Sequence, residues 1–497
     1  MALVHSAGPL WSRSRPALLR KVVRHCLFRT IITGGKGTKL EMFPQKLVLP
    51  ENHGYVPTLS PREISMLLTT NEARFMNDGH WSSAVQGFES NQLASNYPIE
   101  DRRAVAQLTQ TDGSLFSVID GHGGMACAQA VTERLFYYVA ASLLPYQHLE
   151  AYSHSLRTDL PIELLGWHKF NNAYRRDPVP PTYRNSLTKF VVESLSLSGL
   201  EDDVDLVANS IKSAFIGLDS DISSEAMPVA GVFDVDALDA AFSGACVCMA
   251  HVSGLDLHVA NSGDSRAVIG QLNDKGQWVA KRMSVDQNVD NEAEVKRVVS
   301  SHPPAEARHV LKNSRLLGQL VPLRAFGDVR FKWSLQELKN LVNLLDTTYV
   351  HSIVPTNYYT PPYLIATPDV MHHRLTPADR FLVMATDGIW ETMSNSRVVQ
   401  LVGEYIEGKE THDHFKPTDS GTKLGEINSV LLKRKATLAR KADDHNVSTH
   451  LIRHALGADH GKVSEMLTLP ADIVRYYRDD MTIVVVYFDS EYIASHQ

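Results

Sequence analysis

Four aspartates stand in sequence contexts that could bring their carboxylates together: Asp120, Asp264, Asp387 and Asp479. The first and third each follow an apolar run and precede a glycine, and the last stands just before an apolar, β-branched run. Asp264 lies in a Gly-Asp-Ser turn between two strand-like runs. Because a strand delivers the side chain at its end to one edge of its sheet, we expect several of these carboxylates to converge there.

Converged carboxylates indicate a metal site. Like charges held together out of water are costly unless a cation neutralises them, and carboxylate oxygens favour Mg²⁺ or Mn²⁺. A glycine after the aspartate lets the backbone come close, so its carbonyl can also serve as a ligand. The alternative for each Asp-Gly pair alone is an ordinary turn. His122, two residues after Asp120, is a candidate proton donor to a leaving oxygen, with a structural histidine as the alternative.

These side chains need strands to carry them, and the sequence predicts such strands. Apolar or β-branched runs predict strands at residues 115–119, 245–252, 255–260, 266–269, 381–385 and 481–488. Helix-like patterns occur at residues 126–144, 203–226, 287–300 and 398–406. Residues 145–200 have mixed composition and several prolines, so we expect loop or insertion there. Strands and helices mix without a strict βαβ alternation, which favours an α+β fold with antiparallel sheet.

The composition is that of an ordinary globular protein. The chain has 497 residues, of which 43% are hydrophobic and 21% are charged. These values exclude a disordered, collagen-like or coiled-coil chain. No uncharged apolar run reaches the roughly 18 residues that a membrane span needs. Four cysteines in such a length exclude a disulfide scaffold and indicate a reducing compartment.

The N-terminal segment differs from the rest of the chain. Residues 1–40 contain eight Lys or Arg residues and no acidic residue, with apolar residues between the basic ones. This pattern is typical of a mitochondrial presequence, and a disordered basic tail is the alternative. Without the segment the chain carries 41 basic and 56 acidic residues, a net charge of −15. Such a chain is a poor candidate for nucleic-acid binding, because phosphate contacts need clustered Lys and Arg.

Six sequence elements together resemble the metal-dependent type 2C protein serine/threonine phosphatases. They occur in the family's order and are Glu100-Asp101, Phe116-Ser-Val-Ile-Asp-Gly-His-Gly-Gly124, Asn261-Ser-Gly-Asp-Ser-Arg266, Arg324-Ala-Phe-Gly-Asp328, Ala385-Thr-Asp-Gly-Ile-Trp390 and Arg478-Asp-Asp-Met-Thr482. The resemblance implies an α+β fold with a central β-sandwich of two mainly antiparallel sheets flanked by helix pairs. It implies a phosphatase domain at residues 85–490, preceded by an extension at residues 41–84. Insertions near residues 145–235, 335–362 and 407–470 exceed a minimal domain and are candidate docking surfaces.

The resemblance also implies roles for individual residues. Asp120 would bridge two Mg²⁺ or Mn²⁺ ions, and the Gly121 carbonyl would bind one of them. The remaining implied metal or metal-water ligands are Asp387, Asp479, Glu100 and Asp101. The implied reaction is direct hydrolysis, in which a water held between the metals attacks phosphorus and His122 protonates the seryl oxygen.

Three positions depart from the family pattern. Asn96 stands where many members have an arginine that holds the phosphate, so we expect phosphate capture either to be weaker or to come from another residue. Glu391 stands where many members have aspartate, which leaves open a third metal site formed by Asp264 and Glu391. Asp480 stands where many members have asparagine.

Further motifs resemble the mitochondrial members of the family that act on pyruvate dehydrogenase, among them Pro98-Ile-Glu-Asp-Arg-Arg103 and Thr449-His-Leu-Ile-Arg-His454. This resemblance implies a matrix enzyme whose substrate is the phosphorylated pyruvate dehydrogenase alpha subunit. It also implies docking on the lipoyl domain of the acetyltransferase core, with Ca²⁺ as a candidate docking cofactor, and a regulatory subunit as a candidate partner. The alternatives are a phosphatase for another matrix protein, such as branched-chain keto acid dehydrogenase, or a non-catalytic docking protein.

Overall fold

The computed structural model describes residues 58–77, 83–158, 161–170, 180–197, 205–345, 353–412, 425, 427–429, 431–432 and 444–497. The expected presequence at residues 1–40 lies outside the described residues, as do residues 41–57 of the expected extension.

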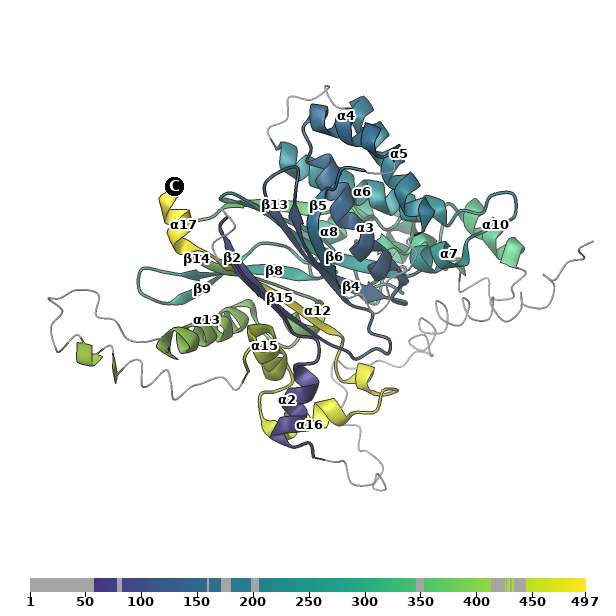
Figure 1. Cartoon of the computed structure of the whole chain (residues 1–497). Coiled ribbons are helices and arrows are strands. Elements are labelled where there is room, and N and C mark those ends of the chain that lie inside the picture. Colours follow the sequence, from purple (N-terminus) through teal and green to yellow (C-terminus); the bar gives the residue numbers. More distant parts are fainter. Residues whose placement is uncertain are drawn as a thin grey trace, which may run out of the picture.

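Two antiparallel sheets form the centre of the fold (Figure 1). The first sheet runs in the order β1 (Ala73–Met76), β2 (Val85–Leu93), β15 (Met481–Phe488), β14 (Asp379–Ala385), β8 (Arg266–Leu272) and β9 (Trp278–Arg282). The second runs in the order β13 (Asp369–Arg374), β7 (Asp256–Ser262), β6 (Gly244–Ser253), β4 (Ser114–His122), β3 (Arg102–Leu108) and β5 (Leu165–Phe170), with β12 (Phe326–Gly327) also paired to β6.

Helices cover the outer face of each sheet (Figure 1). The second sheet is covered by α3 (Ala126–Ser142), α4 (Tyr146–Ser155), α5 (Pro181–Leu197), α6 (Leu206–Glu225) and α7 (Val235–Phe242), with α8 (Glu292–Ser300), α9 (Ala307–Val310) and α10 (Leu335–Leu345) joining the same core. The first sheet is covered by α2 (Pro61–Leu68), α12 (Asp387–Trp390), α13 (Asn395–His412), α15 (Val447–Ala455) and α16 (His460–Thr468). The shorter elements are β10 (Leu311–Lys312), β11 (Arg315–Leu316), α17 (Ser490–Ser495) and the 3₁₀ turns η2 (Pro304–Glu306), η3 (Val329–Phe331) and η4 (Val474–Tyr476).

Alternating side chains divide each central strand between two cores. On β4, Phe116 and Val118 belong to the core between the two sheets, whereas Leu115 and Ile119 belong to the core under the helices. The neighbouring strands show the same alternation, because successive side chains of a strand point to opposite faces. The result is the four-layer α+β sandwich that the resemblance implied.

The predicted strands and helices are confirmed in type and position, with small shifts of their ends. The strand predicted at residues 115–119 continues to His122, so Asp120 stands within β4 near its end. The expectation of a loop at residues 145–200 was wrong over much of its length, because α4, β5 and α5 lie there and β5 pairs with β3. One of the prolines behind this prediction, Pro181, begins α5, and proline is well accommodated at a helix start.

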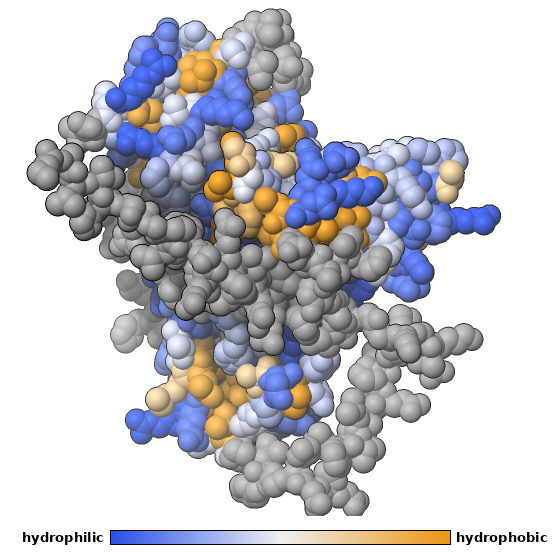
Figure 2. Space-filling view, turned by 90° about the vertical axis from the view of Figure 1, so that its right-hand side faces the viewer, coloured by the Kyte–Doolittle hydropathy of each residue, from blue (hydrophilic) through white to orange (hydrophobic). Residues whose placement is uncertain are grey.

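The described surface is mixed in character. Figure 2 shows a largely hydrophilic face with separate hydrophobic patches in its upper and lower halves. Between α6 and α7, Val229 and Val232 pair in a short turn and are 73% and 72% exposed. None of the described helices is long and apolar enough to cross a membrane.

Candidate active site

The inward-facing rows of both sheets change from apolar to polar at one end of the sandwich. On β4 the row of Phe116 and Val118 continues to Asp120 at the end of the strand. On the first sheet, the buried Thr386 and Thr482 extend the inward rows of β14 and β15. The N–H of Thr386 donates a hydrogen bond to the Thr482 carbonyl. This end of the inter-sheet core therefore carries oxygen ligands instead of hydrocarbon.

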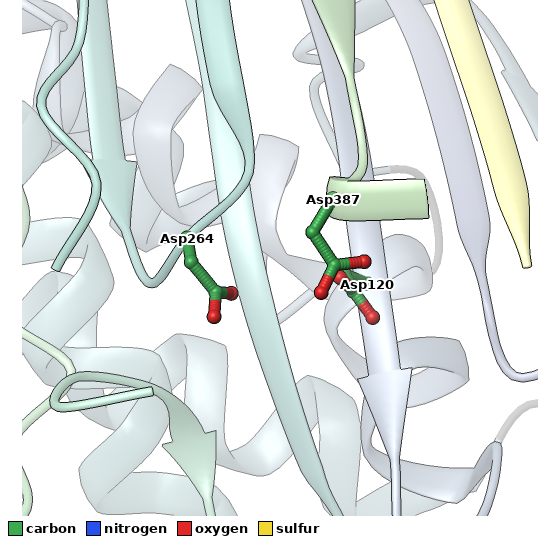
Figure 3. A group of neighbouring side chains, drawn as sticks. All are labelled: Asp120, Asp264 and Asp387. Carbon is green, nitrogen blue, oxygen red and sulfur yellow. The ribbon is translucent and has the colours of Figure 1, made fainter. Parts of the chain in front are cut away.

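Three aspartates form the centre of this polar rim: Asp120, Asp264 and Asp387 (Figure 3). Each offers a carboxylate oxygen, and the three oxygens lie within 4.8 Å of one another. Asp120 comes from β4, Asp264 from the turn between β7 and β8, and Asp387 from the first position of α12. In Figure 3 the Asp264 side chain extends toward the other two. The structure thus brings together residues that are far apart in the sequence.

Burial and mutual repulsion make these carboxylates hard to ionise together. Burial raises the pKa of Asp120 well above its usual range, and the charges of Asp387 and Asp101 raise it further. Burial likewise raises the pKa of Asp387, with the charges of Asp264 and Asp479 adding to the effect. A bound cation would remove this cost, because it favours the charged form of each group.

The other acidic residues predicted for the site lie around this centre. Burial raises the pKa of Asp101, Asp479 and Glu391, and the charge of Asp479 contributes to the shift at both Asp101 and Glu391. Asp264 also acts on Glu391, so this glutamate lies within electrostatic reach of the central group. Glu100 is buried, and its charge reaches His122. All of the predicted acidic site residues therefore belong to one region.

The glycines that follow two of the aspartates allow close backbone packing. A Cβ at Gly121 would lie 2.3 Å from the carbonyl oxygen of Glu100, and one at Gly388 would lie 2.2 Å from that of Asp480. Real Cβ atoms do not approach this closely, so each position requires glycine. Each glycine thereby holds one acidic sequence element against another.

The structure gives a reason for two of the departures from the family pattern. Asp480 accepts hydrogen bonds from the backbone N–H groups of Asn96 and Glu100, both at 2.8 Å, and from Ser95 N–H at 2.5 Å. The Asn96 side chain donates to the same carboxylate at 3.2 Å. Asn96 is buried and engaged with Asp480, so it supports the loop that leads to Glu100.

The donor set fits a hard divalent cation. The acidic residues supply carboxylate oxygens, the ligands that Mg²⁺ and Mn²⁺ prefer. Cys246 lies beside this group, but burial raises the pKa of its thiol well above the usual range, and the charges of Asp264 and Asp120 raise it further. A thiol is also a softer ligand than these carboxylates and suits Mg²⁺ or Mn²⁺ less well.

His122 stands next to the acidic centre and has a carboxylate partner of its own. Its Nε2 lies 2.5 Å from Oδ2 of Asp328. Burial lowers the pKa of His122, but the charge and hydrogen bond of Asp328 outweigh burial and raise it overall. Sequence reasoning assigned no role to Asp328, although the residue stands in the quoted motif Arg324-Ala-Phe-Gly-Asp328.

Comparison with known proteins defines the class. A family model described as protein phosphatase 2C matches residues 182–427. Bovine pyruvate dehydrogenase (acetyl-transferring) phosphatase 1, mitochondrial, is 46% identical over 462 residues, which cover 88% of this chain and 85% of the relative. Human pyruvate dehydrogenase (acetyl-transferring) phosphatase 2, mitochondrial, is 42% identical over 461 residues, with the same two coverages.

The chain belongs to the protein phosphatase 2C family and is a metal-dependent protein serine/threonine phosphatase. Within that family it is similar to the mitochondrial enzymes just described, and it is a mitochondrial protein.

Proposed function

We propose that this phosphatase removes phosphate from serines of the pyruvate dehydrogenase alpha subunit in the mitochondrial matrix and so restores that enzyme to activity. The observation that carries the proposal is the 46% identity to a bovine relative that is named for this substrate; the matched region covers 85% of that relative's length. The acidic centre between the sheets supports the hydrolytic part, because it supplies the ligands that a metal-dependent phosphatase needs.

We propose that two Mg²⁺ or Mn²⁺ ions occupy the acidic centre. The residues that would hold them, directly or through water, are Asp120, the Gly121 carbonyl, Asp387, Asp479, Glu100 and Asp101. Asp264 and Glu391 are candidate ligands of a third ion. The charge of Asp264 contributes to the raised pKa of Glu391, which supports pairing the two residues. When bound, the ions would lower the pKa of a water and offset the charge of the phosphoryl group.

The chain's own residues would position and complete the reaction. Gly121 and Gly388 keep the acidic elements in contact, and the loop held by Asp480 places Glu100 beside them. His122 would donate the proton that the departing seryl oxygen needs. The other cysteines that the structure describes, Cys127 and Cys248, are buried thiols like Cys246, which supports hydrolysis without a cysteinyl-phosphate intermediate.

We further propose docking on the lipoyl domain of the acetyltransferase core. The exposed pair Val229 and Val232, within the insertion near residues 145–235, supplies an apolar surface suited to this contact. Ca²⁺ as a docking cofactor and a regulatory subunit belong to the same proposal, and the resemblance alone supports them.

The test measures phosphate release from the phosphorylated alpha subunit by the chain without residues 1–40. Reactions contain Mg²⁺ or a chelator, and Asp387→Asn serves as the matched inactive variant. A phosphorylated branched-chain dehydrogenase subunit competes in parallel reactions. We expect Mg²⁺-dependent release that the variant loses and that favours the pyruvate substrate.

Two results would contradict the proposal. Release without preference would move the substrate assignment to another matrix phosphoprotein. Mn²⁺ binding without release from either substrate would indicate a docking protein.

A further inference from the structure

The pair formed by His122 and Asp328 joins two sequence elements 206 residues apart. Nε2 of His122 lies 2.5 Å from Oδ2 of Asp328, and the side chains are 22% and 7% exposed. With Nε2 engaged in this contact, Nδ1 is the ring nitrogen left to face a substrate. The contact therefore leaves Nδ1 as the ring nitrogen that can exchange a proton with a substrate.

The backbone that carries Asp328 adopts a conformation that is uncommon for residues other than glycine. Asp328 has φ +48°, and Gly327 before it has φ +66°. A Cβ at Gly327 would lie 2.2 Å from the carbonyl oxygen of Ser243, so this position requires glycine. Left-handed backbone at a non-glycine residue is costly and persists only where the surroundings hold it.

Asp219 on α6 holds the backbone segment around Asp328 in place. Its carboxylate accepts from Gly327 N–H at 2.9 Å and from Nζ of Lys332 at 2.7 Å. Lys332 also donates to the Ala325 carbonyl at 2.8 Å. The N–H of Asp328 itself donates to the Ser243 carbonyl at 2.9 Å. These contacts fix the segment on both sides of Asp328.

The neighbouring strand β6 leaves room for the pair, because Gly244 stands opposite His122 in the sheet. A Cβ at Gly244, the first residue of β6, would lie 2.1 Å from Nε2 of His122 and 2.2 Å from Oδ2 of Asp328. No other residue type fits at this position without separating the two side chains. Three separate features thus favour the contact between His122 and Asp328. Asp219 and Lys332 hold the backbone segment, Asp328 has a positive φ, and Gly244 has no side chain that would separate the pair.

We propose that Asp328 is a positioning residue for phosphoserine hydrolysis, which holds the His122 ring so that Nδ1 faces the departing seryl oxygen. This inference rests on the proposed role of His122 as proton donor. As the bond between phosphorus and the seryl oxygen breaks, its electron pair stays on that oxygen, which takes the proton from Nδ1. The attacking water leaves one hydrogen on the released phosphate and gives the other to solvent, from which the imidazole is reprotonated.

The proposal predicts an effect that depends on the leaving group. A seryl oxygen is a strong base and needs a proton to depart, whereas a nitrophenolate is a weak base and departs without one. Removing the partner of His122 should therefore slow hydrolysis of a phosphoserine peptide by about tenfold to a hundredfold. Hydrolysis of p-nitrophenyl phosphate should change little. A residue with a merely structural role would affect both substrates alike.

The test uses Asp328→Gly, which removes the carboxylate and keeps a residue suited to positive φ. Asp328→Asn is the conservative variant, because its amide oxygen still accepts a hydrogen bond, and it should recover part of the loss. Gly244→Ala separates the pair without deleting either member and should reproduce the loss. Asp379→Asn is the matched control, since Asp379 holds a distant histidine, His373, at 2.9 Å.

We measure kcat on both substrates, Mn²⁺ affinity by calorimetry and folding by circular dichroism. We expect a selective loss on phosphoserine in Asp328→Gly and Gly244→Ala, with unchanged Mn²⁺ affinity. Equal losses on both substrates, no loss on either, or weakened Mn²⁺ binding in a folded Asp328 variant would overturn the proposal. Absence of metal-dependent hydrolysis in the unsubstituted protein would instead refute the proposed function.

Discussion

The close approach of β4 to the loop before β3 makes Gly121 a sensitive position. In a Gly121→Ala variant the new Cβ would lie 2.3 Å from the Glu100 carbonyl oxygen, where ordinary contact begins at 3.4 Å. Either the strand or the loop must then move by about 1 Å, and overpacking of this kind costs about 1–3 kcal/mol. A displacement of about 1 Å at reacting groups can cost about a hundredfold in rate.

We therefore expect Gly121→Ala to fold, to lose a few degrees in Tm and to hydrolyse phosphoserine about a hundredfold more slowly. Mn²⁺ affinity, measured by calorimetry, should fall as well, because Asp120 and Glu100 lie on either side of the contact. Gly166→Ala on β5 is the matched control, since its Cβ would lie 3.3 Å from the Thr109 methyl and 3.9 Å from the Gln107 carbonyl oxygen, without a backbone clash. Wild-type activity and Mn²⁺ affinity in Gly121→Ala would refute the argument that this backbone contact positions the metal ligands.

Three further outcomes follow from the site and the surface. In the metal-free protein the pKa of Asp120 lies above its usual 3.8, so the folded state retains protons that the unfolded chain releases, and stability should fall as the pH rises above about 4. Thermal unfolding across pH with chelator or Mn²⁺ tests this, and a chelated protein that grows more stable as the pH rises from 4 to 8 would contradict it. Asp264→Asn should raise the Tm of the chelated protein, because one buried charge is removed, and should lower Mn²⁺-dependent turnover; a lower Tm with full activity would argue against repulsion at the centre. Replacing Val229 and Val232 by serine should weaken binding to an isolated lipoyl domain by roughly tenfold while phosphopeptide turnover stays unchanged, and unaltered binding would place the contact elsewhere.

Most of the strands and helices could be predicted from the local pattern of apolar and β-branched residues. The continuous apolar and β-branched composition of residues 481–488 predicted β15 with the bounds that the structure shows, because a strand buried on both faces needs no polar alternation. Pro181 was misleading for a physical reason: proline breaks a helix interior but suits a helix start. Local sequence cannot tell these two uses apart when the following pattern is weak.

The sequence by itself determined the chemical class of the site. Aspartates beside glycines at strand ends indicated a metal site before any distance was known, and the resemblance of six sequence elements to the type 2C phosphatases implied the reaction. The structure decided what spacing cannot, namely which groups meet. Asp328 reaches His122, and Asp219 reaches the Gly327 N–H beside it, only because α6, β4 and the segment before η3 pack together. The engagement of Asn96 with Asp480 likewise depends on two loops 384 residues apart. Such contacts arise from the packing of whole sheets and helices, so no local window of sequence contains them.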